Sequence, residues 1–267
     1  MPRNPAKNYI KYSPIESEFT IVNTYEDPRW GQVKIMENRQ NHQRVLVVER
    51  RVDNEVLLTR EVNHAERRLR LNNSGLLELK DYSTRKVPEL CTTYYVIRYY
   101  YEEIPTDLQK EILERKKRNM GFSDQELTYI LYNCVDAGKR LQENKIAHGD
   151  ISPLRIGFMP NPLCTKLIDK ENYNETAFQS QTVRLMSGKP IYMCDEYYGS
   201  AVKNKIAANC PEVKNDVFML GLCLLEAGNM ESVQNIYNKS GGNIVKGDLD
   251  DHLRKFSESF KVFLLIF

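Results

Sequence analysis

The sequence predicts an α+β fold of two lobes: an N-terminal lobe with a five-stranded antiparallel sheet plus one helix, and a mainly helical C-terminal lobe. Five short segments rich in β-branched and aromatic residues fall within the first hundred residues. A segment with apolar residues at helical spacing lies between the third and the fourth of them. Longer segments with helical spacing follow. Strands first and helices afterwards are typical of the α+β class.

The strands are predicted at residues 19–22, 32–36, 44–49, 76–79 and 94–97. A continuous apolar run at residues 45–48 indicates that the third strand is buried on both faces. Residues 26–30 contain a proline and are turn-like. The helix of this lobe is predicted over residues 54–71, where apolar side chains recur between charged ones.

The second half of the chain is predicted to be mainly helical. A charged helix is expected at residues 108–118, and Ser123 with Glu126 forms a capping box that opens the next helix. The apolar stripe of that helix comprises Leu127, Ile130, Leu131, Cys134, Gly138 and Leu141. The polar residues 170–188 show little apolar periodicity and are predicted to form a long loop. The almost wholly apolar residues 217–225 predict a buried central helix.

The composition excludes several classes of protein. With 41% apolar and 28% charged residues, the 267-residue chain has the make-up of a globular protein with a sizeable core. A net charge of +2 gives no global field that would attract nucleic acid or an anionic membrane. Residues 1–14 are polar and basic, unlike a signal peptide, and no apolar run is long enough to span a bilayer. We therefore expect a cytoplasmic protein.

The six cysteines are far apart in the sequence, at Cys91, Cys134, Cys164, Cys194, Cys210 and Cys223. No two of them form a C-x-x-C pair, so the spacing indicates neither a zinc site nor a disulfide framework. Buried single thiols in a reducing compartment are the expectation.

Two aspartates on neighbouring loops are the candidate chemical centre. Asp150 follows the long predicted helix, and Asp169 follows a short apolar run about a dozen residues beyond that loop. Two carboxylates so placed suit proton transfer and metal binding around a phosphate, in a cleft between the lobes. Aspartates in turns also cap backbone N–H groups, so the pair alone does not decide between these roles.

The order of motifs resembles the eukaryotic protein kinase family over nearly the whole chain, from about Phe19 onward. His148-Gly149-Asp150 resembles the family's H-R-D motif, and Asp169-Lys170-Glu171 resembles its D-F-G motif. Cys194-Asp195-Glu196 resembles its A-P-E motif, and Asn215-Asp216-Val217 resembles the start of its central helix. The resemblance implies a kinase fold.

The resemblance also implies ATP and Mg²⁺ as cofactors and a protein as substrate or partner. Asp150 would be the catalytic base and Asp169 the metal ligand. The nucleotide would contact Gly31, Val33, Leu46, Arg50, Ile97 and Tyr99. Structural roles are implied for His148, Glu61, Glu196 and Asp216.

On the nucleotide side the sequence departs from the family's pattern. Residues 26–33 match the glycine-rich loop but keep only Gly31 and Val33 of it, and they carry Glu26 and Asp27 where phosphates would lie. The third-strand lysine aligns with Val48, and Leu46 replaces the small alanine beside the adenine.

Two further positions need an assignment: the cation that would replace the strand lysine, and the helix glutamate that would pair with it. Arg50, two residues after Val48, keeps the same facing and is the candidate substitute, although arginine and lysine are not interchangeable there. Glu61 is the first match to the helix glutamate, and Glu66 is the alternative.

The catalytic loop departs as well. Arg155 stands at the asparagine that ligates the second magnesium, where it would oppose the ion, hold a phosphate or pair with Asp169. Ser152 replaces a lysine, and Gly149 replaces the arginine that docks a phosphorylated activation loop. After Asp169 come Lys170, which would neutralise that carboxylate, and Glu171, which lacks glycine's freedom.

For the structural positions the resemblance implies internal contacts. His148 would pack and hydrogen-bond inside its loop, and Asp216 would accept backbone N–H groups of that loop. The family's partner of Glu196 is an arginine on a late helix, and we expect this chain to end before it, leaving Glu196 unpaired or the chain incomplete.

Three hypotheses follow. The first is a pseudokinase, a kinase-fold binding or scaffold module with a protein partner. The second is an active ATP-dependent Ser/Thr-type kinase that uses Asp150 and Asp169. The third is a truncated, poorly folding product, suggested by the apolar residues 262–267. The predicted domains are an N-terminal extension at 1–18, an N-lobe at 19–98 and a C-lobe at 99–267 that is incomplete at its end.

Overall fold

The computed structural model describes residues 10–71, 75–90, 92–160, 163–170, 175–238, 240–254, 256, 257 and 261. The chain divides into two compact units. The first consists of Met1–Asn72 and Leu77–Ile104, and the second of Asn73–Leu76 and Pro105–Phe267. Predictions for Cys91, Glu171 and residues 262–267 lie outside the described residues.

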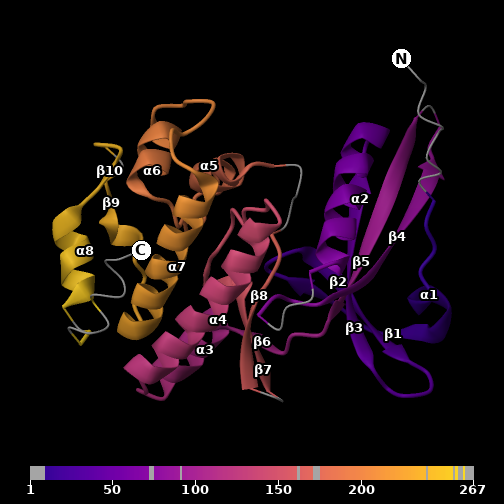
Figure 1. Ribbon diagram of the computed structural model, residues 1–267, viewed down its shortest axis with the longest axis horizontal. Helices are drawn as coiled ribbons and strands as arrows, with labels where there is room; N and C mark the ends of the chain where they lie inside the picture. The colour runs from indigo at the N-terminus through magenta and orange to yellow at the C-terminus, as the bar shows by residue number, and fades with distance from the viewer. Residues whose placement is uncertain are drawn as a thin grey trace. The chain divides into compact units, whose positions relative to one another are not determined.

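The first unit contains one five-stranded sheet in the spatial order β1-β2-β3-β5-β4 (Figure 1). Its strands are β1 (Phe19–Asp27), β2 (Gly31–Asn38), β3 (Arg44–Val52), β4 (Leu79–Pro88) and β5 (Thr93–Glu102). All neighbouring pairs are antiparallel, and α2 (Glu55–Leu69) connects β3 to β4. The predicted antiparallel sheet with one inserted helix is therefore confirmed.

The fourth strand is misplaced in the sequence-based prediction. The apolar run at residues 76–79 was expected to form it, but β4 begins only at Leu79 and continues to Pro88. Leu76 instead forms an isolated parallel bridge with Leu167 in the second unit. Because β4 lies at the edge of the sheet, most of its residues are polar and lack the apolar run typical of a buried strand.

Helices pack on both faces of the sheet. On one face, which we call the α2 face, lie Val33, Leu46, Val48, Arg50, Ile97, Tyr99 and Tyr101, as the strand register shows. The opposite face holds a core of Phe19, Val45, Val47 and Tyr100, with Ile15 of α1 (Ile15–Glu18) packed against it. Residues 45–48 of β3 are all buried, which confirms burial of this strand on both faces.

The second unit is mainly helical. Its α-helices are α3 (Leu108–Lys117), α4 (Asp124–Glu143), α5 (Ala177–Met186), α6 (Asp195–Val202), α7 (Glu212–Asn229) and α8 (Lys246–Leu253). A small sheet joins β6 (Thr106–Asp107), β7 (Ile156–Pro160) and β8 (Leu163–Leu167), and β9 (Tyr237–Asn238) pairs with β10 (Asn243–Ile244). The described residues of this unit also form the short 3-10 helices η1 (Pro153–Arg155) and η2 (Gln234–Ile236).

The predicted long helices are present. Ser123 and Glu126 form the complete capping box at the start of α4, and α4 packs against α7. The buried stripe of α4 includes Ala137 where Gly138 was expected, a shift of one position. Residues 217–225 lie within α7, most of whose apolar side chains are buried.

One predicted loop is partly a helix. Within residues 170–188, expected to be irregular, α5 occupies Ala177–Met186. A second capping box opens it, because the Thr176 side chain accepts from the Gln179 backbone and the Gln179 side chain accepts from Thr176. The helix buries Ala177, Phe178 and Gln181. Because Gln181 is polar, the buried side of the helix shows no apolar periodicity in the sequence.

Within the described part of the chain, no helix has the length and hydropathy that a membrane-spanning segment requires.

Candidate functional site

Both carboxylate oxygens of Asp150 are engaged by other side chains of the second unit. Oδ2 accepts a hydrogen bond of 3.3 Å from Arg155 Nε, and Oδ1 accepts one of 3.2 Å from Gln181 Nε2. Arg184 Nη1 lies 3.8 Å from Oδ1 as a further ion pair. Asp150 is only 2% exposed. Its carboxylate thus lies in a closed set of donors.

Arg155 joins the two acidic loops. Its Nε donates to Asp150, and its Nη1 donates to the backbone carbonyl of Asp169 at 2.8 Å. The guanidinium is 3% exposed, and Asp169 itself is 4% exposed. A fixed positive charge therefore occupies the position where the kinase resemblance places a magnesium ligand, and a cation bound there would be repelled.

His148 and Asp216 hold the loop in shape. The His148 ring lies between Ile168, whose carbonyl is 2.8 Å from Nε2, and the Asp150 N–H, which donates to Nδ1 at 3.2 Å. These partners require the neutral tautomer with its proton on Nε2, and burial lowers the pKa of His148 to about 4.

Asp216, on α7, accepts the backbone N–H groups of His148 and Gly149, each at 2.7 Å. Burial raises the pKa of this carboxyl to about 7 despite these bonds. The loop is therefore anchored to the central helix through its backbone.

Helix α5 packs directly on this loop. Gly149 has φ +76°, and a Cβ on it would lie 2.8 Å from the Cβ of Ala177, the first residue of α5. Ala177 N–H donates to Glu212 at 3.1 Å, which fixes the start of α5 to α7. A glycine at position 149 thus permits the close approach that brings Gln181 and Arg184 to Asp150.

The Lys170 ammonium, expected to neutralise Asp169, hydrogen-bonds to a backbone carbonyl of a later residue. It donates to the carbonyl of Glu175 at 2.8 Å. Burial lowers the pKa of this lysine, with nearby carboxylates opposing the shift. The contact ties Lys170 to the segment that leads into α5.

Glu196 has a partner in this structure, so of the two expected alternatives, an unpaired Glu196 or an incomplete chain, the first does not hold. Lys214 Nζ lies 3.4 Å from its carboxylate. Glu196 also lies near two thiols, Cys194 and Cys210, whose Sγ atoms are 3.7 Å apart. Among the described residues this is the group of Cys, His, Asp and Glu side chains close enough to share a metal ion. Sequence spacing missed it, because the thiols are sixteen positions apart.

In the first unit, the β1–β2 turn is closed by an internal ion pair. Arg29 donates to both carboxylate oxygens of Asp27, at 2.8 and 2.6 Å, and both residues are 3% exposed. Gly31 follows with φ +72°, which favours glycine at the end of this turn. The negative charge of Asp27 is therefore neutralised locally.

The α2 face holds a row of aromatic rings. Trp30 stacks on Tyr101 at a centroid distance of 5.7 Å, and Tyr101 stacks on Tyr99 at 6.0 Å. The Tyr99 hydroxyl donates to Glu61 of α2, and burial strongly raises the pKa of this phenol. The rings extend from the β1–β2 turn to α2.

On the α2 face, Val48 packs among strand neighbours, whereas Arg50 reaches α2. Val48, aligned with the family's lysine, is 1% exposed and pairs with Val33 and Tyr99 across the strands. Arg50 lies 3.7 Å from Glu61 and 5.5 Å from the Tyr99 ring centre.

Of the two glutamates considered as the helix partner, Glu61 is thus the one that meets the strand cation. Glu66 instead accepts a hydrogen bond of 2.5 Å from Tyr82. The other two positions implied for nucleotide contact, Leu46 and Ile97, are 1% and 0% exposed on the same face.

Comparisons with known proteins bear on the fold. No protein-family model matches the chain, and no curated protein matches it. Among solved structures, the PknI kinase domain of Mycobacterium tuberculosis is similar, with a TM-score of 0.54 and 13% identity. The match covers 80% of this chain and 75% of that one. This chain has a protein-kinase-like fold. At this identity the likeness shows the architecture alone, and the chemistry has to be inferred from the residues of this chain.

Three side chains that contact the predicted site residues, two in the second unit and one in the first, are not predicted by the sequence. Gln181 and Arg184 lie in a segment whose composition predicts a loop, and a loop has no helical spacing that would direct both side chains toward Asp150. The Thr176-x-x-Gln179 pattern was the available signal. Trp30 falls in the predicted turn at residues 26–30, and its stacking on Tyr101 depends on the sheet register.

Proposed function

We propose that this protein is a pseudokinase, a kinase-fold module that binds a protein partner and does not transfer phosphate. The observation that carries the proposal is the closed set of donors around Asp150, formed by Arg155, Gln181 and Arg184. A catalytic base must come within about 3 Å of the proton that it removes. A substrate hydroxyl would first have to displace one of these buried donors.

The residues present do not fit a magnesium–ATP complex of the kind that the kinase resemblance implies. Arg155 places a cation at a magnesium-ligand position, and Val48 offers the phosphates no charge. Tyr101, the strand partner of Leu46, has Trp30 stacked on its ring, beside the position where the resemblance places an adenine. Each lost contact would slow phosphoryl transfer by about a hundredfold or more.

A second candidate, a slow Ser/Thr-type kinase, rests on one observation. Arg50 lies 3.7 Å from Glu61, so a strand cation meets a helix carboxylate as the lysine and glutamate do in active kinases. Asp150 and Asp169 are also retained. For phosphoryl transfer, Arg50 would have to turn partly from Glu61 toward the phosphates, and Arg155 would have to move away from Asp150.

The proposal includes a cytoplasmic location and a protein partner. Cys134 and Cys223 are buried free thiols, the form that cysteines keep in a reducing compartment. Burial raises the pKa of Cys134 to about 12, so this thiol is unreactive.

Thermal denaturation of the full chain with ATP and magnesium tests nucleotide binding. A ligand at a hundred times its dissociation constant stabilises the fold by about 2.7 kcal/mol, and that would raise the Tm by about 5 °C or more. We expect a change below about 1 °C at about 5 mM ATP, relative to magnesium alone. A larger rise that disappears in Arg50→Met would favour the kinase candidate instead.

A further inference from the structure

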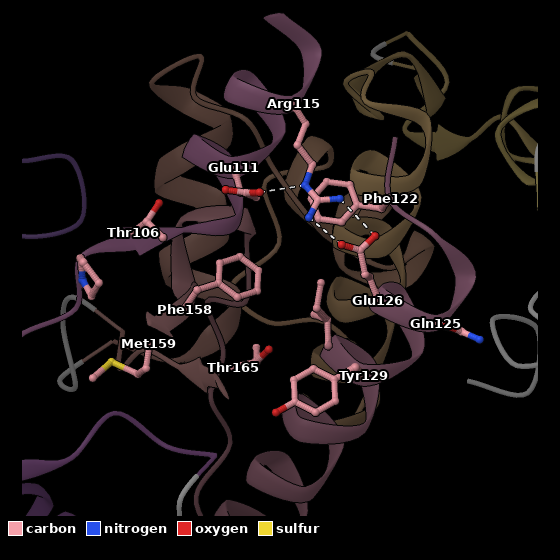
Figure 2. A pocket seen from close by; sticks show the side chains of 12 residues that line it. Thr106, Glu111, Arg115, Phe122, Gln125, Glu126, Tyr129, Phe158, Met159 and Thr165 are labelled. Atoms are coloured by element: carbon pink, nitrogen blue, oxygen red, sulfur yellow. Dashed lines mark hydrogen bonds and ion pairs between the residues drawn. The ribbon is translucent and has the colours of Figure 1, made fainter. Parts of the chain in front are cut away.

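The second unit contains a cavity of about 670 Å³ that the kinase-like site does not use. It lies between α3, α4 and the β6-β7-β8 sheet (Figure 2). Its walls are mainly apolar and aromatic, with Phe122, Tyr129, Ile130, Phe158 and Met159 among the lining residues. Cavities of about 300–1,000 Å³ with apolar walls are typical of small-molecule sites.

Strand register explains which side chains form one wall of the cavity. Thr106 of β6 pairs with Phe158 of β7, and Phe158 pairs with Thr165 of β8. Residues directly opposite one another in antiparallel strands point to the same face. The three side chains therefore form one row across the sheet, and all three line the cavity.

Thr165 supplies a polar group without a protein partner. It is 1% exposed, and its Oγ1 has no hydrogen-bond partner among the described residues. Figure 2 shows the hydroxyl turned toward the space between the rings of Phe158 and Tyr129. A buried hydroxyl left unpaired is unfavourable, so its position in a cavity wall indicates a ligand that bonds to it.

The charges at the cavity are already paired with one another. Arg115 donates to Glu126 at 2.6 Å and to Glu111 at 2.8 Å, and its guanidinium lies 4.1 Å from the ring centre of Phe122. Figure 2 shows this group as one connected set. With two carboxylates around one guanidinium, an anionic ligand would meet net negative charge.

We infer that this cavity binds an uncharged aromatic molecule with a hydroxyl or carbonyl group that hydrogen-bonds to Thr165. Its ring system packs against Phe158 and Tyr129, and the paired charges exclude anions. This site is independent of the proposed pseudokinase function, since it uses neither Asp150 nor Asp169.

Isothermal titration of the full chain with 2-naphthol tests the inference. We expect a dissociation constant below about 1 mM. Thr165→Val, which keeps the shape and removes the hydroxyl, is expected to weaken binding about fivefold. The anion 2-naphthoate is expected to bind at least about fivefold more weakly than 2-naphthol. Met159→Trp, which puts a larger side chain into one wall of the cavity, is expected to weaken binding by at least about threefold.

The matched control is Thr128→Val on the outer side of α4, whose hydroxyl donates to the Asp124 carbonyl. It should leave naphthol binding unchanged. The apo Tm of Thr165→Val should be equal to or above that of the wild type, because an unpaired buried hydroxyl is removed.

Four results would overturn the inference. These are naphthol affinity unchanged in Thr165→Val, naphthol affinity unchanged in Met159→Trp, naphthoate binding as tightly as naphthol, and a lowered Tm of Thr165→Val, which would reveal a protein partner for the hydroxyl. Absence of any naphthol binding at about 1 mM would also overturn it.

Discussion

Asp150 lies in a set of contacts that stabilise the fold by keeping a buried carboxylate paired. Arg155 reaches it from the same loop, whereas Gln181 reaches it from α5, thirty-one positions later. An unpaired charge at such a depth is strongly unfavourable, so each donor has a structural role whether or not the site has an activity.

Removing the guanidinium of Arg155 should therefore destabilise the protein. We expect Arg155→Met to lower the free energy of unfolding by about 3 kcal/mol, because Asp150 loses a buried partner. Urea denaturation measures the change. Arg254→Met is the matched control, since Arg254 pairs with Asp251 at 77% side-chain exposure and should cost less than about 0.5 kcal/mol. Equal stability of the two variants would contradict the role given to Arg155.

His148 should make the fold sensitive to acid. Its pKa of about 4 lies below the ordinary value of 6.5, so the unfolded chain takes up the proton first as pH falls. The stability that the neutral ring contributes is complete above pH 6.5 and is lost between pH 6.5 and 4, by about 3 kcal/mol.

The test compares the pH dependence of unfolding in the wild type and in His148→Gln. Asp216 acts in the opposite direction, since its raised pKa of about 7 stabilises the fold as pH falls from 7 toward 4. The difference between the two proteins isolates His148. The variant should show a less steep loss of stability on acidification, and parallel curves would refute the assignment.

At the scale of elements, helix α5 is the element that closes the surroundings of Asp150. It starts at a capping box, packs its first residue on Gly149 and carries two donors for Asp150. The start of α5 is predictable from Thr176 and Gln179, because they match the capping-box pattern that correctly predicted the start of α4 at Ser123. Its buried Gln181 conceals the apolar period.

A pair of glycine substitutions tests the packing of α5. Gly149 and Gly31 both have positive φ, so an alanine at either position costs about 1 kcal/mol of backbone strain. Only at Gly149 would the new Cβ meet another residue, at 2.8 Å from the Ala177 Cβ. Gly149→Ala should be less stable than Gly31→Ala by at least about 1 kcal/mol in urea denaturation. Equal losses would mean that α5 does not pack on the loop.

The sheet of the first unit was largely predictable because its inner strands are apolar. Residues 45–48 have the composition of a doubly buried strand, and they are one. The edge strand β4 was misplaced because its side chains are mostly polar. Arg50 could be anticipated as facing the same way as Val48, since side chains alternate along a strand, but its contact with Glu61 requires the position of α2.

At the scale of the whole molecule, the chain combines a kinase-like fold with departures from the family's phosphate- and metal-binding pattern in both units. The first unit has a valine at the lysine position and stacked rings on the α2 face. The second has a guanidinium between its two acidic loops. The motif order sufficed to predict the architecture. Long-range partners of Asp150 depend on how α5 packs, which local sequence patterns do not specify.

Transfer of labelled γ-phosphate from magnesium–ATP, to the protein itself and to a Ser/Thr-rich acceptor protein, tests the central claim most directly. Asp150→Asn, checked for an unchanged fold by its cooperative unfolding, is the matched control. We predict that label incorporated by the wild type does not exceed that of this variant. Incorporation by the wild type that is lost in Asp150→Asn would contradict the pseudokinase assignment and make Asp150 a working catalytic base.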